Sequence, residues 1–93
     1  MAMDVNVRNV DDLAQFGRSI KMLGENMVSA MQQAQQKMNQ ACEGWNDDNT
    51  QKFQAEFDDS LRAIRKISDR FTEFADYIKR YTDAVGELRN IRL

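Results

Sequence analysis

Few side chains in this 93-residue sequence could carry out covalent chemistry. Cys42 is the only cysteine, and the chain has no histidine, which is the commonest general base and metal ligand near neutral pH. A cysteine nucleophile needs a neighbouring base to hold it as the thiolate, and none is offered here. We therefore predict no enzymatic activity, no metal site and no cofactor.

Charge and hydropathy exclude several classes of partner. The 13 basic and 15 acidic residues are mixed along the chain and give a net charge of −2, which argues against nucleic-acid binding. No apolar run reaches the roughly 18 residues of a membrane span, so direct membrane insertion is not expected. The first residues have neither the basic nor the apolar region of a Sec signal peptide, and any export is expected to use another route.

The most distinctive group is aromatic and lies mid-chain, in the motif Gly44-Trp45-Asn46-Asp47 with Phe53 following. Gly44 can adopt the left-handed conformation that ends a helix, and Asn46, Asp47 and Asp48 are competent caps for the next one. We expect Trp45 to fold back and bury its ring beside Phe53. The ring then either closes the end of a helical hairpin or faces a partner, and one ring can do both.

The arm before this motif has the periodicity of a helix packed lengthwise on another. Asn9 is expected to cap it, with Asp11 and Asp12 in the first turn. Gly17 and Gly24, seven residues apart, either let another helix approach closely or are weak points. After Met27 the apolar residues of this arm are Met and Ala, which predicts close packing of that end against the aromatic start of the second arm. The predicted seam consists of Leu13, Phe16, Ile20, Leu23 and Met27.

The second arm repeats more strictly, with steps of three and four from Ile64 to Leu88, as in a coiled coil. Leu61 and Tyr77 widen the stripe. The pairs Asp58–Arg62 and Arg65–Asp69 have the spacing of ion pairs on a solvated helix face. The predicted seam consists of Phe57, Ile64, Ile67, Phe71, Phe74, Ile78, Tyr81, Val85 and Leu88.

These elements predict an all-α fold with a single domain over residues 1–93. It comprises a helix over about 10–42, a turn at 43–48 and a second helix over about 49–90, which form an antiparallel hairpin. A lone hairpin leaves much of its apolar stripe exposed to water, and pairing two hairpins into a four-helix bundle buries that stripe. We expect a dimer, with a homodimer as first choice and a heterodimer as the alternative.

With its length, two amphipathic arms, missing signal peptide, and Trp45 followed by Phe53 eight positions later, the chain resembles the WXG family. These are the roughly hundred-residue, early-secreted-antigen-like proteins of type VII secretion. The family has Trp-x-Gly where this sequence has Trp45-Asn46-Asp47. Many relatives also carry a C-terminal Tyr followed four residues later by Asp or Glu. Here the residue four positions after Tyr77 is Tyr81, and the residue four positions after Tyr81 is Val85, so the signal is absent in that form. Tyr81, Asp83 and Glu87 are the residues that a variant of the signal would use.

The resemblance implies a bacterial, non-enzymatic protein secreted by the type VII route without a Sec signal, and otherwise cytoplasmic. It implies export as a folded dimer, or action as the secretion partner of a WXG-like protein or of the helical domain of a larger effector. A secretion ATPase is the implied machinery. The alternative is a cytosolic coiled-coil dimerisation or adaptor module unrelated to secretion, since dimerisation alone explains every periodic feature.

Overall fold

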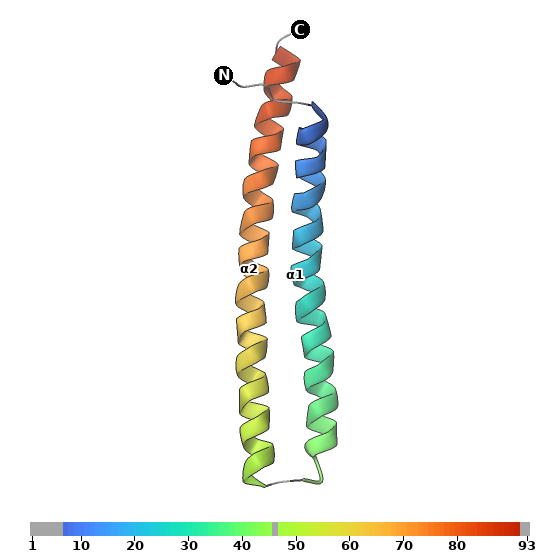
Figure 1. Ribbon diagram of the computed structural model, residues 1–93, viewed down its shortest axis with the longest axis vertical. Helices are drawn as coiled ribbons and strands as arrows, with labels where there is room; N and C mark the ends of the chain where they lie inside the picture. Colours follow the sequence, from blue (N-terminus) through green and yellow to red (C-terminus); the bar gives the residue numbers. More distant parts are fainter. Residues whose placement is uncertain (1–6, 46, 92–93) are drawn as a thin grey trace.

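The chain folds into a rod of two antiparallel helices. The computed structural model describes residues 7–45 and 47–91, with side chains over 9–45 and 47–88. Helix α1 spans Val7–Cys42 and helix α2 spans Asp48–Ile91, and the two lie side by side along their length (Figure 1). The molecule measures 69 × 19 × 15 Å. The predicted all-α helical hairpin is confirmed.

Helix α1 begins earlier than the sequence pattern predicted. Because the helix starts at Val7, Asn9 lies inside it, and the prediction that Asn9 caps it is wrong. Asp11 and Asp12 likewise fall beyond the first turn, which contains no acidic residue. Val10 explains the extension, since it is buried, and packing of an apolar face stabilises a helix more than local propensity does. The predicted lead-in at residues 1–6 lies outside the described residues.

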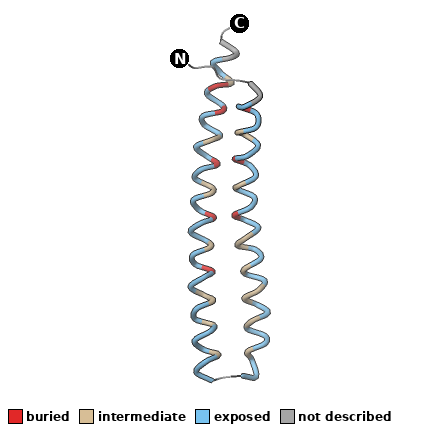
Figure 2. The backbone as a smooth tube through the Cα atoms, viewed as in Figure 1, coloured by how far each residue is buried: buried red, intermediate tan, exposed pale blue. Residues whose placement is uncertain are grey.

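The two helices meet along an inner seam whose buried positions are mostly small residues. On α1 its buried positions recur every seven residues, at Val10, Gly17 and Gly24. In Figure 2 the buried positions line the facing edges of the helices. On α2 the buried positions are Leu61, Ser68, Ala75, Thr82 and Val85.

The two glycines of α1 serve close approach. A Cβ at Gly17 would lie 3.1 Å from Cγ2 of Ile78, and one at Gly24 would lie 2.9 Å from Oγ and 3.0 Å from Cα of Ser68. A Cβ at either position would press on the facing helix, and at Gly24 the side chain or backbone of Ser68 would have to shift. Of the two readings of these glycines, close approach is the one that the structure supports.

Packing is looser towards the turn. Among the described residues between Gly24 and Leu61, none is fully buried, and Met27, Met31, Met38 and Phe57 are half-buried. The Met/Ala end of α1 thus lies against the aromatic start of α2, as the hydrogen bond from Gln54 to Asn39 shows, but the two pack less closely than predicted. Larger side chains fill the seam there, and no glycine lets the helices approach.

Candidate protein interaction surface

The predicted seam does not lie on one side of each helix, because the hairpin divides it into two rows. The inward row contributes to the inner seam, and its members are half-buried or, for Val85, fully buried. They are Leu13, Ile20, Met27, Phe57, Ile64, Phe71, Ile78 and Val85. The other row faces solvent, so the interpretation of one continuous hairpin seam needs correction.

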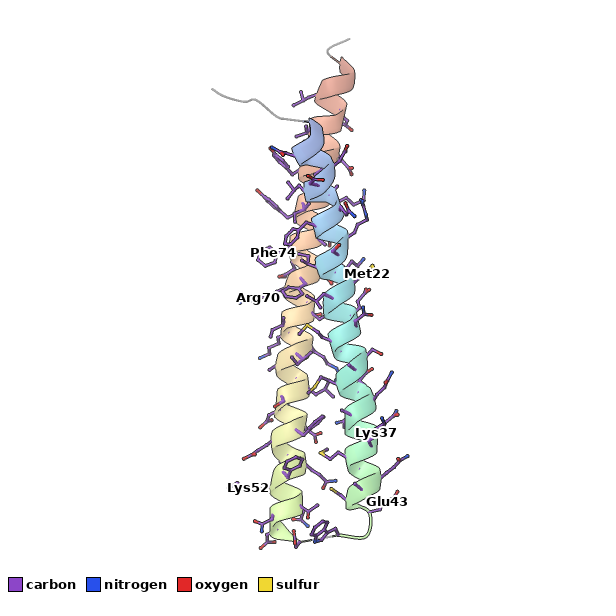
Figure 3. All side chains as sticks on the ribbon, turned by 45° about the vertical axis from the view of Figure 1, so that its right-hand side comes forward. Met22, Lys37, Glu43, Lys52, Arg70 and Phe74 are labelled. Atoms are coloured by element: carbon purple, nitrogen blue, oxygen red, sulfur yellow. The ribbon has the colours of Figure 1, made fainter. Side chains whose placement is uncertain are left out.

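We call the solvent-facing row the outer stripe. Its members are large, and those on α2 recur every seven residues from Ile67 onward, which places them one above another on the helix. Phe74, for example, is 56% exposed, and Figure 3 shows it projecting from α2 away from the seam. The outer stripe consists of Phe16, Leu23, Ile67, Phe74, Tyr81 and Leu88.

The opposite long side of the hairpin is polar, and we call it the polar flank. Nε2 of Gln35 on α1 donates a 2.7 Å hydrogen bond to Oδ1 of Asp58 on α2. Residues spaced by sevens from this pair continue the flank in both helices. The polar flank therefore contains Lys21 and Gln35 of α1 and Asp58, Arg65, Thr72 and Lys79 of α2, and its two apolar members, Ala14 and Val28, are half-buried.

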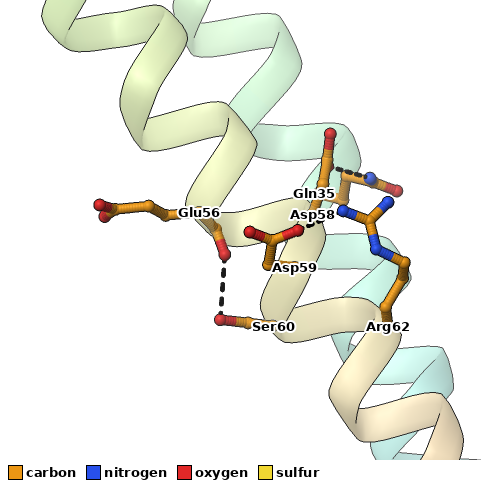
Figure 4. A network of polar contacts seen from close by, with 6 residues as sticks. All are labelled: Gln35, Glu56, Asp58, Asp59, Ser60 and Arg62. Carbon is orange, nitrogen blue, oxygen red and sulfur yellow. Dashed lines mark hydrogen bonds and ion pairs between the residues drawn. The ribbon is translucent and has the colours of Figure 1, made fainter.

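The position of the polar flank fixes that of the outer stripe. In an antiparallel helix pair, positions flanking the seam on one side of the first helix adjoin the matching positions of the second. Gln35 adjoins Asp58 in this way on the polar side (Figure 4). Phe16 and Leu23 flank the seam of α1 on its other side, as Phe74 does on α2. The outer stripe is therefore one apolar face shared by both helices.

Charges on α2 pair locally, though not all as predicted. Arg62 pairs with Asp59 rather than with Asp58, whose carboxylate accepts from Gln35 instead (Figure 4). The predicted Asp58–Arg62 pair is therefore wrong, and the predicted Arg65–Asp69 pair is likewise not formed in the part of the chain that the structure describes. Nζ of Lys79 lies 2.9 Å from Oδ2 of Asp83, a pair not predicted from the sequence, and this hydrogen bond raises the pKa of Lys79.

A cavity of about 440 Å³ opens on the polar flank, lined by residues of both helices. Its charged lining mixes Arg18, Lys21 and Lys79 with Asp76 and Asp83. Neither sign dominates, so its lining gives no preference for a charged ligand. The described residues contain no group of three or more metal-ligating side chains.

The turn carries the predicted cap. Oδ1 of Asp47 accepts hydrogen bonds from the backbone N–H of Thr50 and from its hydroxyl, both at 2.8 Å. These donors satisfy part of the N-terminal end of α2 and hold the pKa of Asp47 below its ordinary value of 3.8, the backbone bond contributing most. Asp47 is thus confirmed as the cap. Asn46 lies outside the described residues.

The other two predictions for the turn are wrong. Gly44 does not adopt the left-handed conformation, and nothing lies within 4 Å of where its Cβ would be. Helix α1 ends instead through two hydrogen bonds that each span three residues, as in a 3₁₀ turn. They run from the Glu43 N–H to the Gln40 carbonyl and from the Trp45 N–H to the Cys42 carbonyl. Glycine is not required at this position by its backbone or its surroundings.

Trp45 is not buried against the end of the hairpin. Its side chain is 65% exposed and that of Phe53 is 60% exposed, although both line one open cavity of about 320 Å³. Half-buried Cys42 shares this cavity with Asp47, Asn49 and Thr50. The two rings therefore lie near each other, as predicted, but form an accessible aromatic surface.

Sequence reasoning missed half of the inner seam on α2. Ser68, Ala75 and Thr82 are buried there, yet small or polar residues do not stand out in a hydrophobic pattern. The available signals were the spacing of seven that links them to Leu61, and the two glycines on the opposite helix. Small residues facing glycines predict a tight contact rather than a solvated face.

The outer stripe is suited to binding apolar side chains. None of the described helices is long and apolar enough to span a membrane. A scan of protein-family models and searches of curated proteins and of solved structures found no match to this chain. The hairpin and its exposed apolar face are therefore the features that bear on function.

Proposed function

We propose that this chain is a non-enzymatic interaction protein of a type VII secretion system, acting as a pair of hairpins in a four-helix bundle. In that role it is exported as a folded dimer, or it accompanies a larger effector whose helical domain takes the place of the second hairpin. The single observation that carries the proposal is the outer stripe, an apolar face to which both helices contribute on one side, with Phe16 and Leu23 from α1 and Ile67 to Leu88 from α2.

The orientation of the apolar residues supports pairing into a bundle. In a four-helix bundle each helix touches two neighbours, so its apolar stripe points between them, towards the bundle axis. Both helices here have this orientation: one row of the stripe faces the other helix and the second row faces outward on a shared side. A two-helix coiled coil that acts alone needs only the first row.

The turn supports the secretion role. Trp45 and Phe53, the residues on which the resemblance to the WXG family depends, form an accessible surface at the tip of the hairpin. An aromatic pair that stabilised only the hairpin would be expected to be buried. Its exposure favours recognition by another protein, and it makes Trp45 the residue to test.

The test compares culture medium from the native host with medium from a strain whose secretion ATPase is inactive, with a cytosolic marker to control for lysis. We expect the protein in the medium only when the ATPase is intact. Trp45→Ala is expected to reduce export while the purified variant stays helical and paired, and Trp45→Phe is the matched control that keeps an aromatic ring.

Retention in the cytosol of both strains, with no partner recovered by affinity purification, would contradict the secretion role. It would favour a cytosolic coiled-coil adaptor instead. One observation favours that second candidate: pairing through the outer stripe accounts for every exposed apolar row without a secretion role, and the tail has Tyr81 and Val85 where relatives carry an acidic residue.

A further inference from the structure

We propose that the tip of the hairpin is a docking site for a positively charged protein segment, whose arginine or lysine side chain lies against the rings of Trp45 and Phe53. The inference rests on the proposed function, because it names the chemistry of the protein that the tip contacts. It follows from three features of the tip: the accessible rings, the engagement of the indole N–H, and the sign of the surrounding charge.

The two rings form an open aromatic site at the end of the rod. More than half of each side chain, Trp45 and Phe53, is exposed, and both line the same cavity of about 320 Å³. The face of an aromatic ring carries the negative part of its quadrupole and attracts a cation, and tryptophan does so most strongly. The accessible faces are therefore suited to a cationic side chain as well as to an apolar one.

The polar edge of the tryptophan is already engaged within the turn. The pKa of Asp47 is lowered mainly by the backbone N–H of Thr50, and a hydrogen bond from the Trp45 side chain acts in the same direction. The indole N–H is the only hydrogen-bond donor of a tryptophan side chain. Because Asp47 accepts from it, the ring face is the part of Trp45 that remains for a partner to contact.

The charge around the rings is negative. Glu43, Asp47 and Asp48 are exposed, and no Lys or Arg occurs from residue 43 to residue 51. Asp47 also lines the cavity of the two rings, and the nearest basic residue of α2, Lys52, does not. A carboxylate beside an aromatic face favours a cation over a neutral or acidic side chain. The same charge opposes contact with an anionic membrane surface, so a basic protein segment is the favoured occupant.

The experiment follows the fluorescence of Trp45 in the full chain, which contains no other tryptophan. The probes are a tetra-arginine peptide with blocked ends and a tetra-citrulline peptide, which has nearly the same shape without the charge. We expect the arginine peptide to change the emission of Trp45 in a saturable way and to bind about tenfold more tightly than the citrulline peptide. Its affinity should fall as salt is added, because exposed charges are screened.

Substitutions at the tip separate its charge from its structure. Asp47→Asn keeps a cap of similar quality at the start of α2, and together with Asp48→Asn it removes the negative charge beside the rings. This double variant should bind the arginine peptide several-fold more weakly, with unchanged helix content by circular dichroism. The matched control, Asp69→Asn with Glu73→Gln, removes the same charge from exposed positions further along α2 and should bind as the native chain does. Phe53→Leu, which removes one ring face, should also weaken binding.

Four outcomes overturn the inference. A constant emission of Trp45 up to millimolar peptide rejects the site, and equal affinity for the arginine and citrulline peptides rejects a cation as its ligand. Equal weakening by the tip variant and by its matched control shows that the peptide follows overall charge and not the tip. A change in emission with phosphatidylcholine vesicles but not with peptide assigns the tip to a membrane surface instead.

Failure of the inference is distinguishable from failure of the proposed function. If Trp45→Ala abolishes export while the double variant at Asp47 and Asp48 is exported normally, the tip acts in secretion through other contacts, and only the inference fails. If the arginine peptide binds the tip as expected but the chain stays in the cytosol of both strains, the site is supported and the secretion role fails.

Discussion

The two long sides of the hairpin differ in chemistry although both consist of residues spaced by sevens on the same helices. The polar flank has a hydrogen bond between the helices and a cavity of mixed charge. The outer stripe presents six large apolar residues to solvent. Water solvates the first side at little cost, whereas exposure of the second is unfavourable by roughly 25 cal/mol per Å² of apolar surface. The proposed partner is therefore expected on the side of the outer stripe and not on the polar flank.

The same comparison shows where the apolar residues of the chain are placed. Among the described residues Leu61 is the largest buried side chain of the inner seam, and the closest approaches printed for that seam are those of Gly17 to Ile78 and of Gly24 to Ser68. Small residues let the helices approach but bury little apolar area. The hairpin therefore places much of its apolar content outside its own core, where the proposed pairing would bury it.

The largest effect is expected from a charge on the outer stripe. Phe74→Asp should separate the pair and halve the mass measured by light scattering, because an unpaired carboxylate cannot be buried at the interface. The matched control Thr72→Asp places the same charge on the polar flank and should leave the mass unchanged. If both variants remain paired, the outer stripe is not the interface.

Phe71→Asp tests whether the hairpin forms independently of the pair. Phe71 is half-buried in the inner row, so a charge there should disrupt contact between α1 and α2. We expect it to reduce helical content by circular dichroism well below that of Phe74→Asp. Equal loss of helix in the two variants would show that the hairpin and the pair form as one unit.

A smaller effect, on the free energy of unfolding, is expected from a substitution in the inner seam. Gly24→Ala adds a Cβ 3.0 Å from the Ser68 backbone, which must shift. Overpacking costs about 1–3 kcal/mol, and the higher helix propensity of Ala returns up to about 1 kcal/mol. We expect a net loss near 1 kcal/mol in the free energy of unfolding, measured by urea denaturation. Gly17→Ala is the matched control: its Cβ would lie no closer than 3.1 Å to Ile78 and would meet side-chain atoms only, so we expect a smaller loss than for Gly24→Ala.

Gln35→Ala tests the polar flank itself. It removes the hydrogen bond to Asp58 and should lower the free energy of unfolding by about 0.5–1.5 kcal/mol, a typical net value for one bond. Light scattering should show no change in the mass of the pair. A change in mass would place the partner on the polar flank, contrary to the proposed arrangement.

The smallest effect concerns the cap of α2. Because the folded-state pKa of Asp47 is lowered, its contribution to stability is present above pH 3.8 and is lost as the pH falls through the folded value. Carboxyl titration by NMR should give a pKa below 3.8 for Asp47. Thermal midpoints of the native chain and of Asp47→Ala should differ above that pH and converge below it; a constant difference would contradict the cap.

The hairpin was predictable from sequence because it depends on helix periodicity and on one turn. Steps of three and four from Ile64 to Leu88 indicate a long helix wherever the stripe faces, and Asp47 is a strong cap beside Thr50. The orientation of that stripe was not predictable. The two rows look alike in the sequence, because each consists of apolar residues spaced by seven: Phe71 and Ile78 belong to one row, and Phe74 and Tyr81 to the other. The packing at Gly24 decides which row faces inward.

The turn was predicted less well because its residues were judged by type. A glycine after a helix commonly adopts the left-handed conformation, but the hydrogen bonds of Glu43 and Trp45 end α1 without it. A tryptophan is commonly buried, but a two-helix rod has no interior at its tip in which to bury Trp45. Residue preferences describe average surroundings, and a hairpin this thin departs from them.

The shape of the rod affects how copies can be counted. A compact domain of this length has a radius of gyration of about 12 Å, whereas that of this chain is 20.6 Å. An elongated molecule diffuses slowly for its mass, so a single hairpin leaves a gel-filtration column early, in the range of a larger globular protein. Elution volume would therefore suggest a dimer even where none exists, and scattering or native mass spectrometry is the measurement that distinguishes one copy from two.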